Sequence, residues 1–216
     1  MLLGVMNMVN PFWDKDDFDV FFTEGLENRM EALQNRIQPK FKKLGTHFAD
    51  RLSAHGTDEF FPHVAKHARR TVNPPKDSWV AFAPAKRGYK AIPHFQVGLW
   101  GSHLFIILAV IYENPDKKAI AERLDRKLDV LTSLPESYIV SGDHMKPEAF
   151  NIKDMKKDGL KQLLERLQTV KKAEFLVGRH LSSEDAIKLS TDEFMAFAEE
   201  TFDCLLPVYD VVINKK

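Results

Sequence analysis

The stretch SWVAFAPAKRGYKAIPHFQVGLWGSHLFIILAVIYE, residues 78–113, decides the fold. It contains three runs rich in β-branched and aromatic residues, at 78–83, 89–100 and 103–113. The loop PAKRG and the two-residue turn Gly101-Ser102 separate these runs, and both are hairpin signals. The stretch therefore predicts a three-stranded antiparallel meander, in which Pro93 marks a bulge or an edge position.

Helical periodicity precedes this meander. Apolar residues recur at steps of three or four along the stripe Leu26, Met30, Leu33, Ile37, Phe41, Leu44 and Phe48. This spacing predicts an amphipathic helix, which Pro39 should kink or divide because proline cannot donate the backbone hydrogen bond of a helix interior. A second helix is predicted from Thr57, a good N-cap, to about Arg70, and Asn73-Pro74-Pro75 then stops it.

Two further strands are expected beyond the meander, in the runs SYIVSGD (137–143) and AEFLVGRHL (173–181). Their order in the sheet is not readable from the sequence. Helical spacing recurs around them, at 120–131, 160–170 and 190–206. Ser190 or Thr191 is expected to cap the last of these helices. Helices that flank a largely antiparallel sheet define the α+β class.

Composition indicates an ordinary globular protein. The chain has 216 residues, 44% hydrophobic and 29% charged, and one domain is expected over 14–216. The apolar start MLLGVMNMVNPFW (1–13) is shorter than the ~20 residues of a membrane span and lacks the features of a signal peptide. It is predicted to be a disordered or strand-like leader outside the core, and no membrane partner is expected. The single cysteine, Cys204, excludes an internal disulfide and favours the reducing cytoplasm.

The charge of the chain is balanced overall but uneven locally. Its 31 basic and 31 acidic residues give a net charge of zero, which argues against attraction of the whole protein to nucleic acid or membrane. Between Phe60 and His94, however, seven Lys and Arg residues face one acid, Asp77, a local charge of +6. The rest of the chain therefore carries −6, and the window from 60 to 94 is the place to look for a site.

Two parts of this window are expected to converge. On the predicted helix, His63, His67 and Arg70 lie along one edge with Lys66 beside them. On the meander, the hairpin tip carries Lys86, Arg87 and Lys90, and strand alternation places His94 and Gln96 on the face shared with Phe105 and Ile107.

Three interpretations of the window compete. Histidines four residues apart have the spacing of two zinc ligands on a helix, but a third ligand is missing and the nearby cations would repel the metal, so no metal is predicted. Basic residues at the end of a helix also complement its dipole, and those at a turn aid solubility. The third interpretation is one cationic surface for a phosphorylated ligand. Its candidate ligand-binding residues are His63, His67, Arg69, Arg70, Lys86, Arg87, Lys90 and His94.

Other motifs carry less information. SGDHMKP (141–147) places Asp143, His144 and Lys146 in a loop, and a turn is favoured over a catalytic dyad. The sequences GxGxxG, GxxxxGK[ST], GxSxG and CxxC are absent, so the common nucleotide, hydrolase and redox signatures are missing and no cofactor is predicted.

Four segments carry a family resemblance. FDVFFTEGLENRMEAL, HVAKHARRTVNPPKDSWVAFA, KRGYKAIPHFQVGLW and LLERLQTVKKAEF, in this order, resemble the YktB-like uncharacterised protein family of Gram-positive bacteria. The similarity spans nearly the whole chain after about Trp13. It implies a small cytoplasmic α+β protein and supplies no activity, cofactor or catalytic residue.

The leading hypothesis is a binding protein for a phosphorylated small molecule, a nucleotide or RNA. An enzyme would use one histidine as general acid or base and the arginines to hold developing charge. That role ranks lower, because no histidine has a carboxylate partner evident in the sequence. The alternative is a protein-interaction or homo-oligomerising module without a small-molecule ligand, and the sequence leaves the oligomeric state open.

Overall fold

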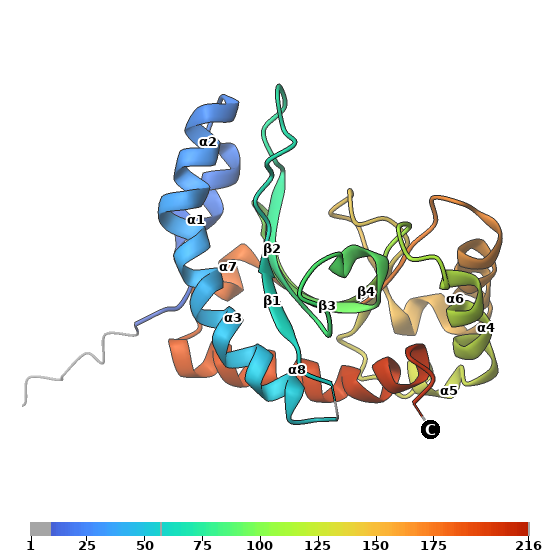
Figure 1. Cartoon of the computed structure of the whole chain (residues 1–216). Coiled ribbons are helices and arrows are strands. Elements are labelled where there is room, and N and C mark those ends of the chain that lie inside the picture. Colours follow the sequence, from blue (N-terminus) through green and yellow to red (C-terminus); the bar gives the residue numbers. More distant parts are fainter. Residues whose placement is uncertain (1–9, 57, 216) are drawn as a thin grey trace, which may run out of the picture.

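One antiparallel sheet runs through the molecule (Figure 1). The computed structural model describes residues 10–56 and 58–215. Within them the sheet has seven strands: β1 (Phe61–Val64), β2 (Asp77–Ala83), β3 (His94–Trp100), β4 (His103–Val110), β5 (Ile139–Ser141), β6 (Phe150–Asn151) and β7 (Phe175–Ser182). Their spatial order is β1-β2-β3-β4-β7-β5-β6. The last strand of the chain thus lies between β4 and β5.

The predicted meander is confirmed in β2, β3 and β4, which pair in sequence order. Gln96 pairs with Ile107, and successive residues of a strand alternate between the two faces of the sheet. His94 and Gln96 therefore share a face with Phe105 and Ile107, as predicted.

The connection from β2 to β3 shortens the second predicted strand. Tyr89–Ala91 form a single 3-10 turn, η3, and β3 begins only at His94. Pro93 directly precedes the first paired residue of β3. Proline has no N–H to donate to a sheet, so it suits this position before the strand.

The amphipathic helix predicted before the meander is present in three parts: α2 (Leu26–Ala32), a π-helical turn η2 (Leu33–Ile37) and α3 (Gln38–Ser53). Pro39 lies in the first turn of α3, and the N–H of Gln38 bonds to the carbonyl of Leu33, five residues back. The proline ring crowds the carbonyl four residues before it, so the helix widens at this point. The division predicted at Pro39 is confirmed.

The other helices of the described chain are α1 (Lys15–Asp19), the 3-10 turn η1 (Val20–Phe22), α4 (Lys117–Arg126), α5 (Asp129–Thr132), α6 (Ile152–Thr169), α7 (Ser183–Ala186) and α8 (Thr191–Val212). A capping box begins α8. The Ser190 hydroxyl accepts from the N–H of Glu193 at 3.3 Å, and the Glu193 carboxylate accepts from the N–H of Ser190 at 2.8 Å. The cap predicted at Ser190 is confirmed.

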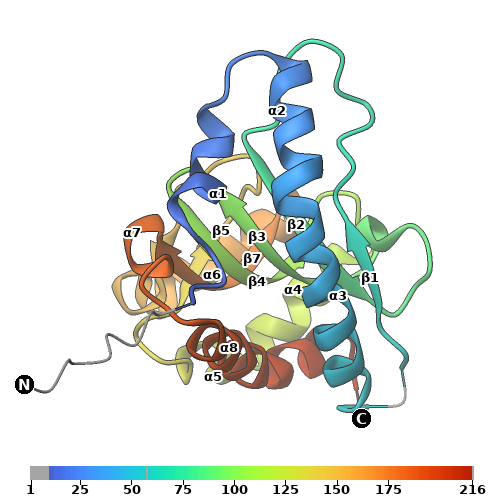
Figure 2. The same ribbon diagram turned by 90° about the vertical axis from the view of Figure 1, so that its left-hand side faces the viewer.

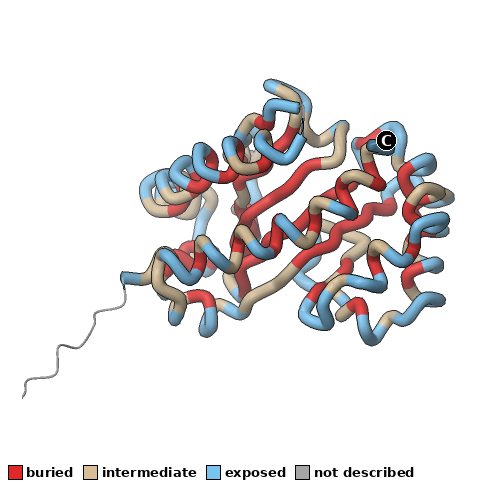
Figure 3. Tube along the Cα trace, turned by 90° about the horizontal axis from the view of Figure 1, so that it is seen from below, coloured by how far each residue is buried: buried red, intermediate tan, exposed pale blue. Residues whose placement is uncertain are grey.

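The long helices cover one face of the sheet (Figures 1 and 2). α3 packs on β1 and β2, α8 packs on β4 and β7, and α4 packs on α6. The main core lies between helices and sheet and includes Phe48 of α3, Phe95 of β3 and Phe202 of α8. In Figure 3 the central strands are buried along their length, whereas the surrounding helices alternate between buried and exposed residues. The chain is thus a single α+β domain.

The opposite face of the sheet carries a smaller apolar cluster. Its members all come from β2, β3, β4, β7 or the residue directly after β4: Trp79, Trp100, Phe105, Ile107, Ala109, Ile111 and Leu176. No residue of a described helix belongs to this cluster. We call this side the open face, and it carries the candidate site.

The helix predicted from Thr57 to Arg70 is wrong. Residues 61–64 form β1, an edge strand in which Val64 pairs with Val80, and residues 65–76 form a loop. Thr57 lies outside the described residues. Pro62 explains the error, because proline is disfavoured in the interior of a helix but is tolerated on an edge strand.

The start of the chain also departs from the prediction of a leader outside the core over 1–13. Residues 1–9 lie outside the described residues, but the Trp13 side chain is fully buried. The Phe12 ring stacks on Phe194 with ring centres 4.9 Å apart, and Pro11 bridges to Ser190. The prediction is wrong for Phe12 and Trp13, because α8 offers them an apolar surface. Among the described residues, no helix has the length and apolar character needed to span a membrane.

Candidate functional site

A cleft of about 460 Å³ opens beside the open face of the sheet. Its size is within the range of small-ligand sites. Five segments form its walls: the 65–76 loop, the start of β2, η3, the segment after β4 and the loop after β5. Its lining residues are Ala65, Lys66, His67, Ala68, Arg69, Arg70, Asp77, Trp79, Tyr89, Lys90, Glu113, His144 and Met145. We call it the cationic cleft.

A second cavity continues from the cationic cleft over the open face. The two share Asp77, Trp79 and His144. The second cavity has a volume of about 30 Å³ and extends to Trp100 and His180. It has room for a water-sized molecule, not for a ring, so a larger ligand belongs in the cationic cleft.

Four cations line the cleft. They are Lys66, Arg69, Arg70 and Lys90. Within 10–56 and 58–215, none of the four takes part in an ion pair or a side-chain hydrogen bond. Lys90 Nζ lies 5.6 Å from the centre of the Trp79 ring. Charges that are free of internal partners are available to an anion.

Two backbone hydrogen bonds hold the first half of the 65–76 loop. Ala65 N–H bonds to the Trp79 carbonyl at 2.9 Å, which extends the pairing of β1, and Arg70 N–H closes a turn on the His67 carbonyl at 2.9 Å. His67 has a left-handed backbone with φ of 50°, and its Nε2 lies 3.1 Å from the Ser78 hydroxyl. Burial, with the charges of Arg70 and Lys90, lowers the pKa of His67 to about 4, so this histidine is neutral at pH 7.

Half of the residues predicted for one site lie elsewhere. His63 Nε2 donates to the Ala85 carbonyl at 2.8 Å, and its ring stacks on Tyr89. His94 is fully buried, with Nδ1 donating to the Ile92 carbonyl at 2.8 Å. Burial lowers the pKa of His63, and it lowers the pKa of His94 to about 4.

The two basic residues at the hairpin tip also stand apart from the cleft lining. Lys86 Nζ lies 5.2 Å from the centre of the Phe61 ring, and Arg87 is exposed. The structure therefore brings together His67, Arg69, Arg70 and Lys90, and it adds Lys66, which the prediction placed beside them.

Asp77 is the first acidic member of the site. It begins β2 opposite Trp100, is 7% exposed and faces both cavities. No other described residue donates a hydrogen bond to its carboxylate. Burial raises the pKa of Asp77 to about 6, although the charges of His144 and Arg70 oppose the rise. In the sequence, Asp77 was only the lone acid among cations.

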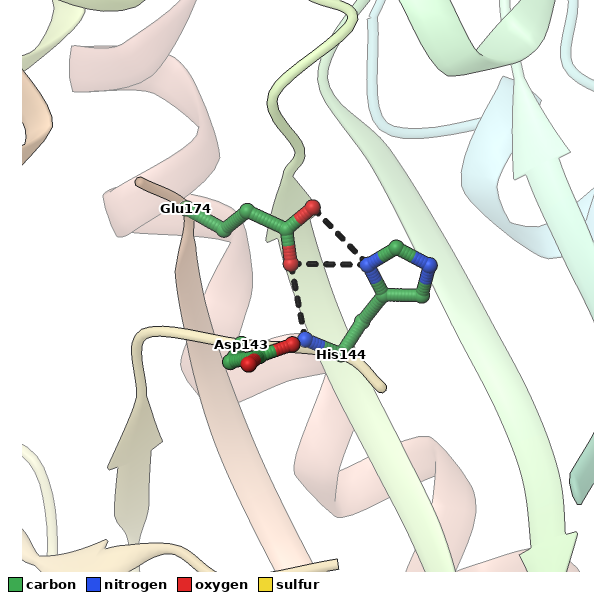
Figure 4. A group of neighbouring side chains, drawn as sticks. All are labelled: Asp143, His144 and Glu174. Atoms are coloured by element: carbon green, nitrogen blue, oxygen red, sulfur yellow. Dashed lines mark hydrogen bonds and ion pairs between the residues drawn. The ribbon is translucent and has the colours of Figure 1, made fainter. Parts of the chain in front are cut away.

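His144, which is half-buried, and Glu174, which is buried, form a pair at the cleft (Figure 4). The Glu174 oxygens lie 2.7 and 2.8 Å from His144 Nδ1, and one of them also accepts from the His144 backbone N–H at 2.7 Å. The backbone N–H of Tyr112 donates to the other at 3.3 Å. Burial disfavours the charged imidazole, but the hydrogen bond and charge of Glu174, helped by Asp77, outweigh it and raise the pKa of His144.

Strand order explains why sequence reasoning missed this pair. Ser141 of β5 is opposite Leu176 of β7, and continuing the antiparallel register places the residues after β5 beside those before β7. The predicted turn at 141–147 is present, since Lys146 N–H bonds to the Asp143 carbonyl at 3.3 Å. The turn agrees with the prediction, but Glu174, the partner of His144, lies 30 residues further along the chain.

The carboxylates of Asp143 and Glu174, beside His144, have hydrogen-bond donors within the protein and do not require a bound cation. Asp143, His144 and Glu174 each offer one atom within 4.8 Å of the others. The Glu174 oxygens already accept from three N–H donors, and Asp143 Oδ1 accepts from Met145 N–H at 2.9 Å. Lys146 Nζ also lies 3.7 Å from the Asp143 carboxylate. The group therefore suits a histidine that holds a proton, and the zinc spacing of His63 and His67 disappears with the helix.

Comparisons with known proteins find close relatives without an assigned activity. A family model described as "Domain of unknown function (DUF1054)" matches residues 13–209. A UPF0637 protein from Lysinibacillus sphaericus is 57% identical over 94% of this chain and 96% of its own length. UPF0637 proteins from Bacillus velezensis and Staphylococcus haemolyticus are 52% and 49% identical, over 94% and 90% of this chain and 97% and 96% of theirs.

Among solved structures, a conserved hypothetical protein from Pyrococcus furiosus aligns with 85% of this chain and 99% of its own. Its sequence is 15% identical and the TM-score is 0.42, so the likeness carries no argument about fold or function.

Proposed function

Because this chain belongs to the family described as Domain of unknown function (DUF1054), whose description assigns no activity, we propose a function from its cleft: it binds a phosphorylated small molecule. The membership confirms the resemblance to the YktB-like family of Gram-positive bacteria. With a single cysteine in the chain, the cytoplasm is the compartment we propose for this function.

The observation that carries the proposal is the gathering around one cleft of four cations that form no ion pair with any described residue. Guanidinium groups of Arg69 and Arg70 match the geometry of phosphate oxygens, and the ammonium groups of Lys66 and Lys90 add point charge. His67 is neutral and adds a hydrogen-bonding ring rather than a further charge. This set favours a dianion such as a phosphate group.

The size of the cleft favours a small molecule over RNA. A volume of about 460 Å³ suits a nucleotide or a sugar phosphate, whereas RNA binding uses an extended charged surface. The chain as a whole has no net charge to attract a polyanion.

Arg70→Glu is expected to weaken phosphate binding at least ~10-fold, because Arg70 faces the cleft and forms no ion pair within the described part of the chain. Arg87→Glu is the matched control: it makes the same charge change in the same basic window, on a residue outside the cleft lining. Isothermal titration calorimetry with inorganic pyrophosphate at low salt should show that the Kd of Arg87→Glu stays within about twofold of the wild-type value.

If Arg70→Glu and Arg87→Glu weakened pyrophosphate binding equally, the anion would be held by diffuse surface charge and not by the cleft. Absence of pyrophosphate binding to the wild-type chain would overturn the proposal. If, in addition, the molar mass of the wild-type protein in light scattering rose with protein concentration, a homo-oligomerising module would become the better interpretation. A binding constant that fell with a steep power of salt and required long oligonucleotides would point to RNA.

A further inference from the structure

We propose that the cationic cleft is also a catalytic centre, in which Asp77 and His144 transfer protons during the hydrolysis of a phosphate ester. This inference rests on the proposed phosphate site and adds a reaction to it. It is carried by the position of the two groups on the same cleft, by the carboxylate that holds His144, and by the absence of a hydrogen bond to the Asp77 carboxylate from any other described residue.

His144 has the arrangement of a histidine held for proton transfer. Glu174 accepts from Nδ1 at 2.7 Å and is itself held by two backbone N–H groups, so it fixes both the orientation and the tautomer of the ring. In Figure 4 the other ring nitrogen, Nε2, points away from Glu174. Since His144 lines both cavities, Nε2 is the nitrogen that can serve a ligand.

Asp77 is the second group because its burial is unexplained by structure alone. Burying a carboxylate that is not paired with a cation and receives few hydrogen bonds destabilises the fold, and such groups in native proteins call for a reason. Asp77 is 7% exposed and lies where the two cavities meet. A ligand or an attacking water in the cleft would supply a further hydrogen bond to this carboxylate.

The charges around these two groups set their roles. Glu174 and Asp77 favour the protonated ring of His144, and Lys90 opposes it; Asp77 itself faces the charges of His144, Arg70 and Lys90. His144 therefore keeps its proton to higher pH than an isolated histidine, whereas Asp77 loses its proton near pH 6. Near neutral pH the carboxylate is the base and the imidazolium is the acid.

The reaction then balances as follows. The Asp77 carboxylate removes a proton from water, and the water oxygen forms a bond to phosphorus. The bond between phosphorus and the ester oxygen breaks, its electron pair stays on that oxygen, and His144 Nε2–H gives the oxygen a proton. The products are an alcohol and phosphate, and exchange with solvent restores both residues. Arg70 and Lys90 hold the phosphoryl oxygens through the transition state.

The test uses the full chain with phenyl phosphate, 4-nitrophenyl phosphate and bis(4-nitrophenyl) phosphate, which separate monoesters from diesters. Asp77→Asn and His144→Gln are expected to lower kcat about 100-fold or more, with pyrophosphate affinity kept within about threefold. Because His144 protonates the leaving oxygen, the decrease in kcat of His144→Gln should be larger for phenyl phosphate, which has the poorer leaving group. His47→Gln is the control, since His47 lies 2.8 Å from Glu199 in an exposed pair away from the cleft.

Glu174→Gln tests the positioning role. It should lower kcat about 10-fold and move the alkaline limb of the pH profile to lower pH, because the amide no longer stabilises the imidazolium. The wild-type profile should rise through about pH 6, as Asp77 ionises, and fall as His144 loses its proton. Thermal unfolding of each variant checks that it is folded.

The possible failures are distinguishable. Binding of pyrophosphate without turnover of any of the three esters would overturn the catalytic proposal and leave the binding proposal standing. Turnover that survives at the wild-type rate in Asp77→Asn or His144→Gln would also overturn it. Absence of pyrophosphate binding would remove the phosphate site on which both proposals depend.

Discussion

Gly178→Ala is expected to lower the free energy of unfolding by about 3 kcal/mol or more. Gly178 lies in the middle of β7, where it pairs with Ile107 of β4 and Ile139 of β5. A Cβ at this position would stand 2.0 Å from the Ile106 carbonyl oxygen and 2.7 Å from the Ile107 Cα. Both are backbone atoms, so the clash is relieved only if β4 and β7 separate.

Gly98→Ala is the comparison for this prediction, because its clash is with a side chain. A Cβ on Gly98 would meet the Phe105 ring at 2.2 Å, and that ring lies on the open face beside a small cavity where it has room to move. We expect a loss of about 1–2 kcal/mol for Gly98→Ala. Urea unfolding followed by far-UV circular dichroism measures both. An equal or smaller loss for Gly178→Ala would contradict the close approach of β4 and β7.

Asp77→Asn is expected to stabilise the protein at pH 8 by about 2–3 kcal/mol. Burial raises the pKa of Asp77 from 3.8 to about 6, so the folded chain holds a proton that the unfolded chain has already released. The wild type therefore loses stability as the pH rises from about 4 to about 6, and it carries the whole loss above that range. Asparagine has no such proton, and the variants should converge near pH 4.

Urea unfolding at pH 4, 6 and 8 measures this difference, and Asp125→Asn is its control. Asp125 is exposed on α4, and among the described residues it forms no ion pair or side-chain hydrogen bond. Its replacement should change stability by less than about 0.5 kcal/mol at each pH. A difference between Asp77→Asn and wild type that stays constant with pH would show that Asp77 ionises normally in the folded chain.

The stability and turnover of Asp77→Asn are expected to move in opposite directions. A carboxylate kept at a cost to stability is the pattern of a functional site, where a residue serves the ligand rather than the fold. A variant that is more stable and less active would therefore support a functional role for Asp77. This result would also exclude unfolding as the cause of its lost activity.

The prediction of a helix over 57–70 is wrong for a reason that is visible in the sequence. Phe60, Val64 and Ala68 recur at helical spacing, which favoured a helix over 57–70. Pro62 interrupts that pattern at a position where a helix interior excludes proline. The segment instead pairs as an edge strand with β2, and this pairing turns the 65–76 loop toward the cleft.

Local pattern by itself determined the meander, the divided N-terminal helix and the cap at Ser190. These features depend on residues within a few positions of one another, through alternation, proline geometry and capping. The basic window from 60 to 94 was likewise visible in composition, and it contains most of the charge that lines the cleft.

Only the tertiary structure decided which basic residues share a site and which acids join them. Glu174 reaches His144 because β7 inserts between β4 and β5, and that order is set by packing between elements far apart in the chain. The pKa of Asp77 rises because burial removes water from its carboxylate. Neither strand order nor burial is encoded by local spacing, so the proton-transferring pair was beyond reach of the sequence.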